Sequence, residues 1–141
     1  MIVSILLVAQ SCFLFQQIRL ADPHVEHAWL EDFALLPSSV PAGSTVVVLD
    51  NMAPWVVGYL PDASVSGPGI FDSRPYAEWE KFLLGTDSDR RAFITQYPLG
   101  TFFFASPVFA AFYPPDVQSV LHHSCLTPTE HDGLYRSVCG S

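Results

Sequence analysis

Hydrophobic residues along the chain fall into short continuous runs, separated by longer segments in which they recur every three or four positions. The run TVVVLD, residues 45–50, follows Gly43 and is mostly β-branched. It predicts a strand buried on both faces, because a strand with one wet face alternates apolar and polar residues. Segments 63–66, 100–106 and 133–138 predict three further strands.

Helical spacing and helix start signals occupy the intervening segments. Asp22 and Pro23 form a start signal for a helix that runs to about residue 37. Pro75 marks the first turn of another helix, which Gly85 ends. Shorter helices are predicted over 53–60, 87–96 and 116–123. The predicted apolar stripes are Val25, Trp29, Phe33 and Leu36 on the first helix, and Tyr76, Trp79, Phe82 and Leu83 on the second.

This alternation of strands and helices predicts an α/β fold, with a small, mostly parallel sheet and flanking helices. A chain of 141 residues, 50% of them hydrophobic, has material for one such core. The predicted organisation is a hydrophobic, transmembrane-like helix over 1–18, a juxtamembrane amphipathic helix over 19–37, and an extracytoplasmic α/β domain over 38–141.

The N-terminal segment MIVSILLVAQSCFLF is almost entirely apolar. No Lys or Arg precedes it and no small-x-small cleavage site follows, so it makes a poor signal peptide. It is also short for a complete membrane span, which needs about 20 residues. We interpret it as the last part of the final span of a longer polytopic membrane protein; an ordinary buried helix is the alternative.

The charge distribution supports a membrane setting and argues against nucleic acid. Six Lys and Arg stand against fourteen Asp and Glu, a net charge of −8 at pH 7 that repels phosphate backbones. Between Arg19 and Arg74 there is no basic residue but there are seven acidic ones. Such a flank is typical of the translocated side of a membrane, so we expect the domain to be extracytoplasmic.

Two cysteines near the C-terminus predict a disulfide. Cys125 and Cys139 enclose thirteen residues, and a bridge there would stabilise the fold by about 3 kcal/mol. The same cysteines with His122, His123 and His131 form an alternative zinc set, but none of these pairs has the short spacing typical of zinc sites. We therefore favour the disulfide and expect no metal site.

A candidate binding site follows from the fold class. Ligands of open α/β sheets bind beyond the carboxyl ends of the strands. Asp50 there is either a hydrogen-bonding or catalytic carboxylate, or a loop residue that satisfies nearby backbone amides. No serine lies in a G-x-S-x-G motif, and the glycines of SVSGPGI lack the spacing of a phosphate-binding loop, so no cofactor is expected. The predicted edge residues are Asp50, Asn51, Gly67, Gly69 and Ser106.

Several segments together resemble one family. After the membrane-helix remnant, VPAGSTVVVLD, APWVVGYLPD, VSGPGIFD, TFFFASPVFAAFYP and YRSVC resemble the soluble tail of polytopic glycosyltransferases that use lipid-linked sugars, such as dolichyl-phosphate-mannose protein mannosyltransferases. The resemblance covers about 38–139. In that family the catalytic acid lies on loops between early membrane helices, which nothing here matches, so no catalytic residue is carried over.

The resemblance implies a noncatalytic module that packs over the membrane part of a larger protein and helps to bind a glycan or protein acceptor. A second hypothesis is a stand-alone, membrane-anchored hydrolase or sugar-binding protein with its site at the sheet edge near Asp50. The two hypotheses differ in whether this chain is the tail of a larger membrane protein or acts on its own.

Overall fold

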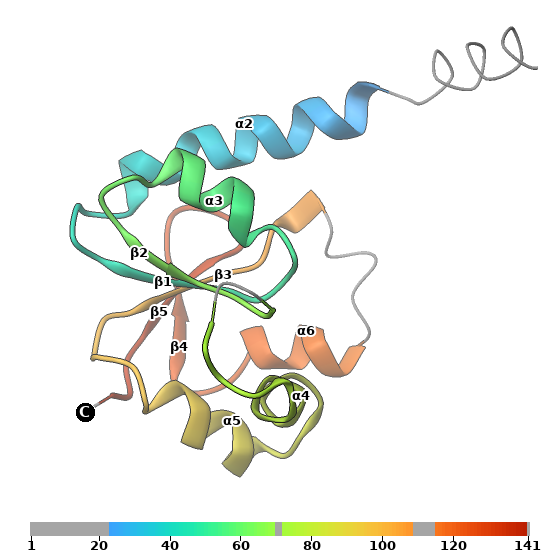
Figure 1. Cartoon of the computed structure of the whole chain (residues 1–141), viewed down its shortest axis with the longest axis vertical. Helices are drawn as coiled ribbons and strands as arrows, with labels where there is room; N and C mark the ends of the chain where they lie inside the picture. Colours follow the sequence, from blue (N-terminus) through green and yellow to red (C-terminus); the bar gives the residue numbers. More distant parts are fainter. Residues whose placement is uncertain (1–22, 70–71, 109–114, 141) are drawn as a thin grey trace, which may run out of the picture.

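A five-stranded sheet forms the middle layer of the molecule (Figure 1). The computed structural model describes residues 23–69, 72–108 and 115–140. Across the sheet the strand order is β2-β1-β3-β5-β4. The strands are β1 (Thr45–Val48), β2 (Ser64–Ser66), β3 (Phe102–Phe104), β4 (Leu126–Pro128) and β5 (Leu134–Ser137).

The sheet is mixed, so the expectation of an α/β fold is confirmed but that of a mostly parallel sheet is wrong. β1 runs parallel to β2 and β3, with Val46 opposite both Val65 and Phe102. β5 is antiparallel to β3 and to β4. The difference comes from β4, a strand that the sequence analysis missed: the connection 129–133 between β4 and β5 is short, and so short a connection joins only antiparallel neighbours.

Helices cover both faces of the sheet. Figure 1 shows α2 (Pro23–Ser39) and α3 (Ala53–Tyr59) on one face. On the other face lie α4 (Tyr76–Leu84), α5 (Asp87–Ile94) and α6 (Pro115–Leu121). The result is a three-layer arrangement, in which the middle strands are shielded from water on both sides.

β1 is buried on both faces, as the sequence predicts. Val46, Val47 and Val48 have no exposed surface. Successive side chains of a strand point to opposite faces. Val46 and Val48 accordingly belong to the core under α2 and α3, and Val47 to the core under α4 and α5.

The helix predicted before the domain packs on the sheet. Phe33 and Leu36 of α2 are fully buried. The ring of Phe33 lies with its centroid 5.8 Å from that of Phe104 in β3 and 6.0 Å from that of Tyr59 in α3. The side chains of Val25 and Trp29, which complete the predicted stripe, lie outside the described residues.

The second core is aromatic. Phe82 of α4 stacks on Phe93 of α5 with ring centroids 4.1 Å apart, and Trp79 meets Phe93 edge-on at 5.0 Å. The predicted stripe is wrong at Tyr76, which is 75% exposed. Each residue turns a helix by about 100°. Tyr76 and Phe82 are six residues apart, so they point about 120° apart and cannot both face the sheet.

The N-terminal hydrophobic segment, residues 1–18, lies outside the described residues. Among the helices that the structure describes, none is both long and apolar enough to cross a bilayer. The transmembrane interpretation therefore stays a prediction.

Cys125 and Cys139 form a disulfide, which confirms that prediction. Their Cα atoms are 5.1 Å apart, inside the range of about 4.4 to 6.8 Å usual for such bonds. The bridge joins the residue before β4 to the end of the chain after β5. The backbone amide of Val138 also donates to the carbonyl of Cys125 at 2.9 Å, so covalent and hydrogen bonds close the same loop.

Removing the disulfide should weaken the fold measurably. We expect C125A/C139A to lower the free energy of unfolding by about 3 kcal/mol, because the unfolded chain regains the freedom of a loop of fourteen residues. Chemical denaturation of the full chain in mild detergent, with and without reductant, measures the change.

The same material provides the control. In a nonreduced digest, the peptides containing Cys125 and Cys139 should be linked, while Cys12 should alkylate freely. Reductant should destabilise the parent chain and leave the double variant unaffected. Two freely alkylated thiols at positions 125 and 139 in protein from its native compartment would contradict the assignment.

Candidate functional site

The predicted site residues Asp50 and Ser106 lie next to each other at the carboxyl ends of two parallel strands. Val48 of β1 pairs with Phe104 of β3, and each site residue follows two positions later. The backbone amide of Ser106 donates to Asp50 Oδ2 at 3.4 Å. Asp50 and Ser106 are therefore neighbours in space, as the sequence predicts.

Both carboxylate oxygens of Asp50 accept hydrogen bonds from backbone amides. Oδ1 accepts from the amide of Met52 at 2.8 Å and Oδ2 from that of Ser106. The first bond stabilises the turn that leads into α3, and the second ties the end of β1 to the end of β3. Asn51, which lies between Asp50 and Met52 in the sequence, is exposed. This geometry fits a loop aspartate that satisfies backbone amides.

The two predicted glycines have different structural roles. A Cβ atom on Gly67 would lie 2.7 Å from the Cβ of Ala53, so this glycine allows the chain after β2 to pack against α3. Gly69 has φ +87°, in the left-handed region that favours glycine, and has open space around it. Gly67 thus serves close packing, and Gly69 serves a turn.

A closed polar network fills the edge beside β2. Ser66 Oγ donates to Asp72 Oδ2 at 2.9 Å, and Arg74 Nη1 donates to the same oxygen at 2.8 Å. The Arg74 guanidinium also lies 4.3 Å from the ring centroid of Tyr97 and hydrogen-bonds its hydroxyl. Burial raises the pKa of Tyr97, and its hydrogen bonds to Ser66 and Arg74 oppose that rise.

Two residues that no sequence pattern singled out approach Asp50 and Ser106, at the carboxyl ends of β1 and β3, from distant parts of the chain. Asp32 of α2 and His131 of the β4–β5 turn are 99 positions apart, yet Asp32 Oδ1 lies 3.7 Å from His131 Nε2. The same Nε2 is 3.2 Å from the carbonyl oxygen of Asp32, and Nδ1 is 2.7 Å from that of Asp132. Both ring nitrogens of His131 thus face backbone carbonyls.

Asp32 has an unusual environment for a carboxyl group. Burial raises its pKa above the ordinary value of 3.8, and His131 and the Ser106 hydroxyl oppose the rise. The negative charges of Asp132 and Asp50 raise the pKa further. Within the described part of the chain, Asp32 Oδ2 and Ser106 Oγ are buried and neither has a hydrogen bond of good geometry, so the Ser106 hydroxyl favours the Asp32 carboxylate only through a contact outside that geometry.

These groups have limited chemical capacity in their present arrangement. Where one carboxyl has a raised pKa and a second carboxylate lies nearby, the first can act as a general acid and the second as a general base. The hydroxyl of Ser106, however, is fully buried. The nitrogens of His131 point at carbonyl oxygens, so the imidazole is not placed as a base for that hydroxyl.

A hollow lies at the opposite end of the sheet, where β1 and β3 begin. It encloses about 570 Å³, and Arg136 of β5 is the one charged residue in its lining. The Arg136 guanidinium lies along Gly100, where an added Cβ would be 3.2 Å from Nη2. Ser39, Ser44 and Thr45 contribute hydroxyl groups to the same hollow. It therefore combines one cation with neutral hydrogen-bonding groups.

The alternative zinc set does not assemble as such. Both cysteines are consumed in the disulfide. His123 is buried, its Nδ1 accepts from the amide of Cys125 at 3.0 Å, and its Nε2 lies 3.1 Å from Asp87 Oδ1. Among residues 23–69, 72–108 and 115–140, no three His, Cys, Asp or Glu side chains gather as a metal site.

The fold and this edge define an α/β protein with a mixed sheet and a carboxylate-bearing strand edge. No known protein family matches the sequence, and neither a curated protein nor a solved structure shows significant similarity to it.

The packing role of Gly67 can be tested with a second glycine as a matched control. Gly67→Ala should lower the free energy of unfolding by about 1 to 3 kcal/mol, because the new methyl group overlaps Ala53. Gly58 lies inside α3 with nothing within 4 Å of its added Cβ, so Gly58→Ala should stabilise the chain by about 0.5 to 1 kcal/mol. Chemical denaturation compares the two. If both substitutions changed the free energy of unfolding equally, close packing would not explain the glycine at position 67.

Asp32→Asn should change how stability depends on pH. A pKa raised in the folded state means that stability is greatest below the ordinary aspartate range and falls as pH rises through the folded-state value. The asparagine carries no charge to bury. We therefore expect its thermal midpoint to exceed that of the parent chain by a few degrees at neutral pH, with the difference shrinking as pH falls through the folded-state pKa of Asp32 and gone below about 4.

Asp62→Asn, at an exposed position, is the control and should leave the pH profile unchanged. An Asp32→Asn variant that is less stable than the parent at neutral pH would show that attraction to His131 outweighs the cost of burial.

Proposed function

We propose that this chain is a noncatalytic, extracytoplasmic accessory domain of a membrane glycosyltransferase-like protein, and that it contacts the glycan or protein acceptor. The observation that carries the proposal is the disulfide between Cys125 and Cys139. Disulfides persist in oxidising compartments, outside the cytosol. The acidic flank that follows the hydrophobic N-terminal segment points to the same side of a membrane.

The noncatalytic part of the proposal is supported by how the edge groups are used. Sugar transfer from a lipid phosphate needs a base at the acceptor hydroxyl and groups that stabilise the departing phosphate. Both oxygens of Asp50 already accept backbone amides, and the only charged group in the large hollow, Arg136, is at the other end of the sheet. The candidate base, Asp50, and the candidate phosphate-binding cation, Arg136, therefore do not face each other across one site.

The hollow at Arg136 offers room for an acceptor on the described surface. Its volume of about 570 Å³ is within the range of about 300 to 1,000 Å³ for ligand pockets, and its hydroxyl groups suit the hydroxyls of a sugar. The guanidinium suits a carboxylate of an acidic peptide or glycan. Acceptor contact at this hollow would orient the substrate toward a catalytic site elsewhere in the larger protein.

Acceptor binding and sugar transfer can be measured on the same preparation. We expect the full chain in nanodiscs to transfer no sugar from a polyprenyl-phosphate carrier, yet to bind an acidic peptide or oligosaccharide in calorimetric titrations. Arg136→Gln should weaken that binding about tenfold, the size expected for losing one charge-assisted hydrogen bond.

Asp50→Asn is the matched comparison at the opposite edge and should leave acceptor binding unchanged. Weaker binding with Asp50→Asn alone would move the acceptor site to the carboxyl edge of the sheet. Transfer that depends on Asp50 would overturn the accessory role and make the chain an enzyme in its own right.

One observation favours a second candidate, a stand-alone, membrane-anchored hydrolase or sugar-binding protein. Asp32 and Asp50 are close enough for the charge of Asp50 to raise the pKa of Asp32. Hydrolases often use one carboxyl as acid and another as base. Under this reading Asp32→Asn and Asp50→Asn should each abolish hydrolysis of a glycoside by the full chain, while its fold stays intact.

A further inference from the structure

Helix α3 is apolar on both faces. Ala53 and Val56 point into the core and are buried. At about 100° per residue, Trp55 and Gly58 lie on the outer side, where Trp55 is 50% exposed, while Val57, 40% exposed, lies on the flank beside Ala53. The helix, APWVVGY, contains no charged residue. A surface helix normally carries polar residues on its outer side, and one that is apolar all round is usually covered on every side. The outer face of α3 therefore has the composition of a contact surface.

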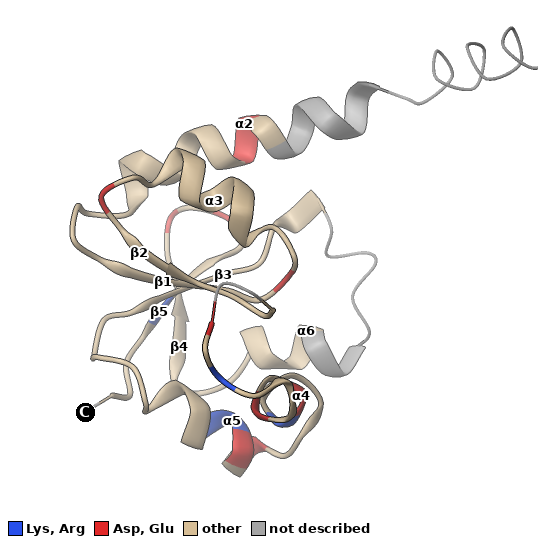
Figure 2. Cartoon of the chain, in the orientation of Figure 1, with Lys and Arg blue, Asp and Glu red and all other residues tan. Residues whose placement is uncertain are grey.

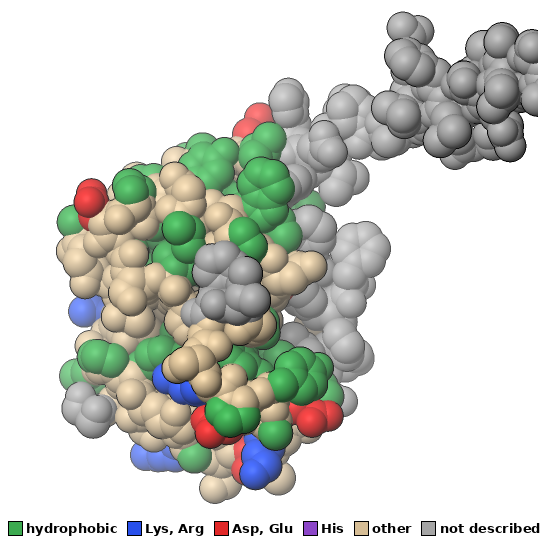
Figure 3. All heavy atoms as spheres, viewed as in Figure 1, with side chains coloured by type: hydrophobic (Ala, Val, Ile, Leu, Met, Phe, Trp, Pro, Cys, Tyr) green, Lys and Arg blue, Asp and Glu red, His purple; other side chains and the backbone are tan. Residues whose placement is uncertain are grey.

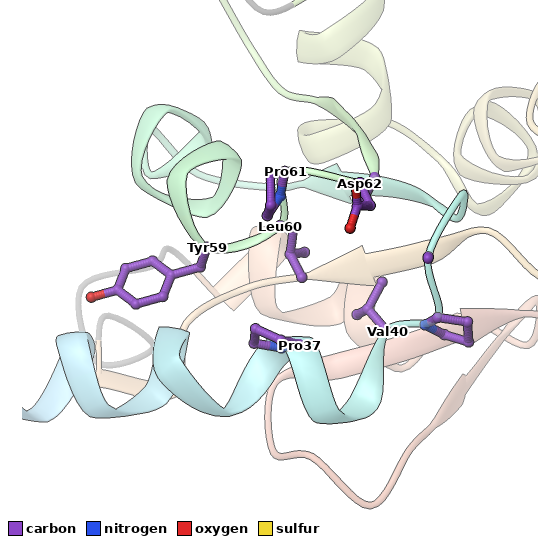
Figure 4. A pocket seen from close by; sticks show the side chains of 9 residues that line it. Pro37, Val40, Tyr59, Leu60, Pro61 and Asp62 are labelled. Carbon is purple, nitrogen blue, oxygen red and sulfur yellow. The ribbon is translucent and has the colours of Figure 1, made fainter.

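The surroundings of this face continue the same composition. Pro54 and Gly58 of α3 are exposed beside Trp55. Where the end of α3 meets the end of α2, a hollow of about 120 Å³ is lined by apolar residues, with Asp62 its one charged member (Figure 4). Figure 3 shows hydrophobic side chains over this layer, with acidic side chains at its margins.

Positive charge is absent from the described part of this layer. Figure 2 shows the basic residues on the opposite side of the sheet and on β5. Attraction to an anionic surface therefore cannot bring the layer to its partner, and the partner must instead accept apolar side chains without needing cations. The described basic residues are Arg74, Lys81, Arg90, Arg91 and Arg136.

Chain connectivity places α3 close to the hydrophobic N-terminal segment. Residues 1–18 precede α2, which begins at Pro23 and spans 17 residues, or about 25 Å. Phe33 of α2 contacts Tyr59 of α3, so the two helices are held together. If the N-terminal segment lies in a bilayer, α3 is tethered within about that distance of the lipid surface.

We propose that the outer face of α3 docks on an uncharged lipid surface, with Trp55 at the level of the head groups. The proposal rests on the membrane attachment inferred above and adds an orientation to it: α2 lies along the membrane rather than standing upright. Tryptophan suits this position because it is enriched at membrane–water interfaces, where its ring lies at the level of the head groups. The α4 and α5 side of the domain would then face the solvent.

Spin labels on the full chain in phosphatidylcholine nanodiscs test this orientation. With Cys12→Ser as background, labels are attached at Gly58→Cys on the outer side of α3, where an added Cβ meets nothing within 4 Å, and, as control, at Tyr76→Cys, an exposed position in the opposite helix layer. Collision rates with oxygen, which concentrates in lipid, and with a water-soluble nickel chelate are compared. We expect the ratio of oxygen to nickel collisions to be several-fold higher at position 58 than at position 76.

Three other outcomes would contradict the membrane attachment, the docking or the assignment to lipid. A chain that fails to co-elute with the nanodiscs overturns the membrane attachment, and the docking with it. Co-elution with equal ratios at both positions overturns the docking and leaves the attachment standing. Loss of both kinds of collision at position 58 means that protein covers α3, either the N-terminal segment or a second copy, and overturns the assignment to lipid.

Discussion

Burial of β1 on both of its faces is the constraint on which the rest of the structure depends. Val46 and Val48 need a cover on one side and Val47 on the other, so neither helix layer alone completes the core. The layer of α2 and α3 covers one set, and α4 and α5 cover the other. Parallel pairing of β1 with β2 and β3 follows, because each connection must pass through a helix layer before returning.

The parts of the fold that could be predicted are those with a strong local pattern. β1 is continuous in β-branched residues, and α4 carries Trp79 and Phe82 on one face, so both were evident from sequence. β4 has only the residues Leu126 to Pro128, with no periodicity, and is a strand because β5 pairs with it. The direction of that pairing turned the expected parallel sheet into a mixed one.

The candidate site likewise combines residues that a local sequence pattern could predict with residues that it could not. Asp50 and Ser106 each lie at the carboxyl end of a predicted strand, so their proximity could be inferred once the strands were neighbours. Asp32 and His131 meet only because the turn after β4 reaches back to α2. The one local hint was that Asp32 adjoins Phe33 on the apolar stripe, at the margin of the core. No spacing rule links positions 99 residues apart.

The sheet ends in two short strands that offer little to other chains. β2 and β4 form its edges, each has three residues, and β4 includes Pro128, which has no N–H to donate. The disulfide additionally holds the segment before β4 against the end of the chain after β5. Short edges and edge prolines are how natural sheets resist adding foreign strands. A domain with so much apolar surface on its helices can thus remain free of strand-by-strand aggregation, because growth of the sheet is blocked at both ends.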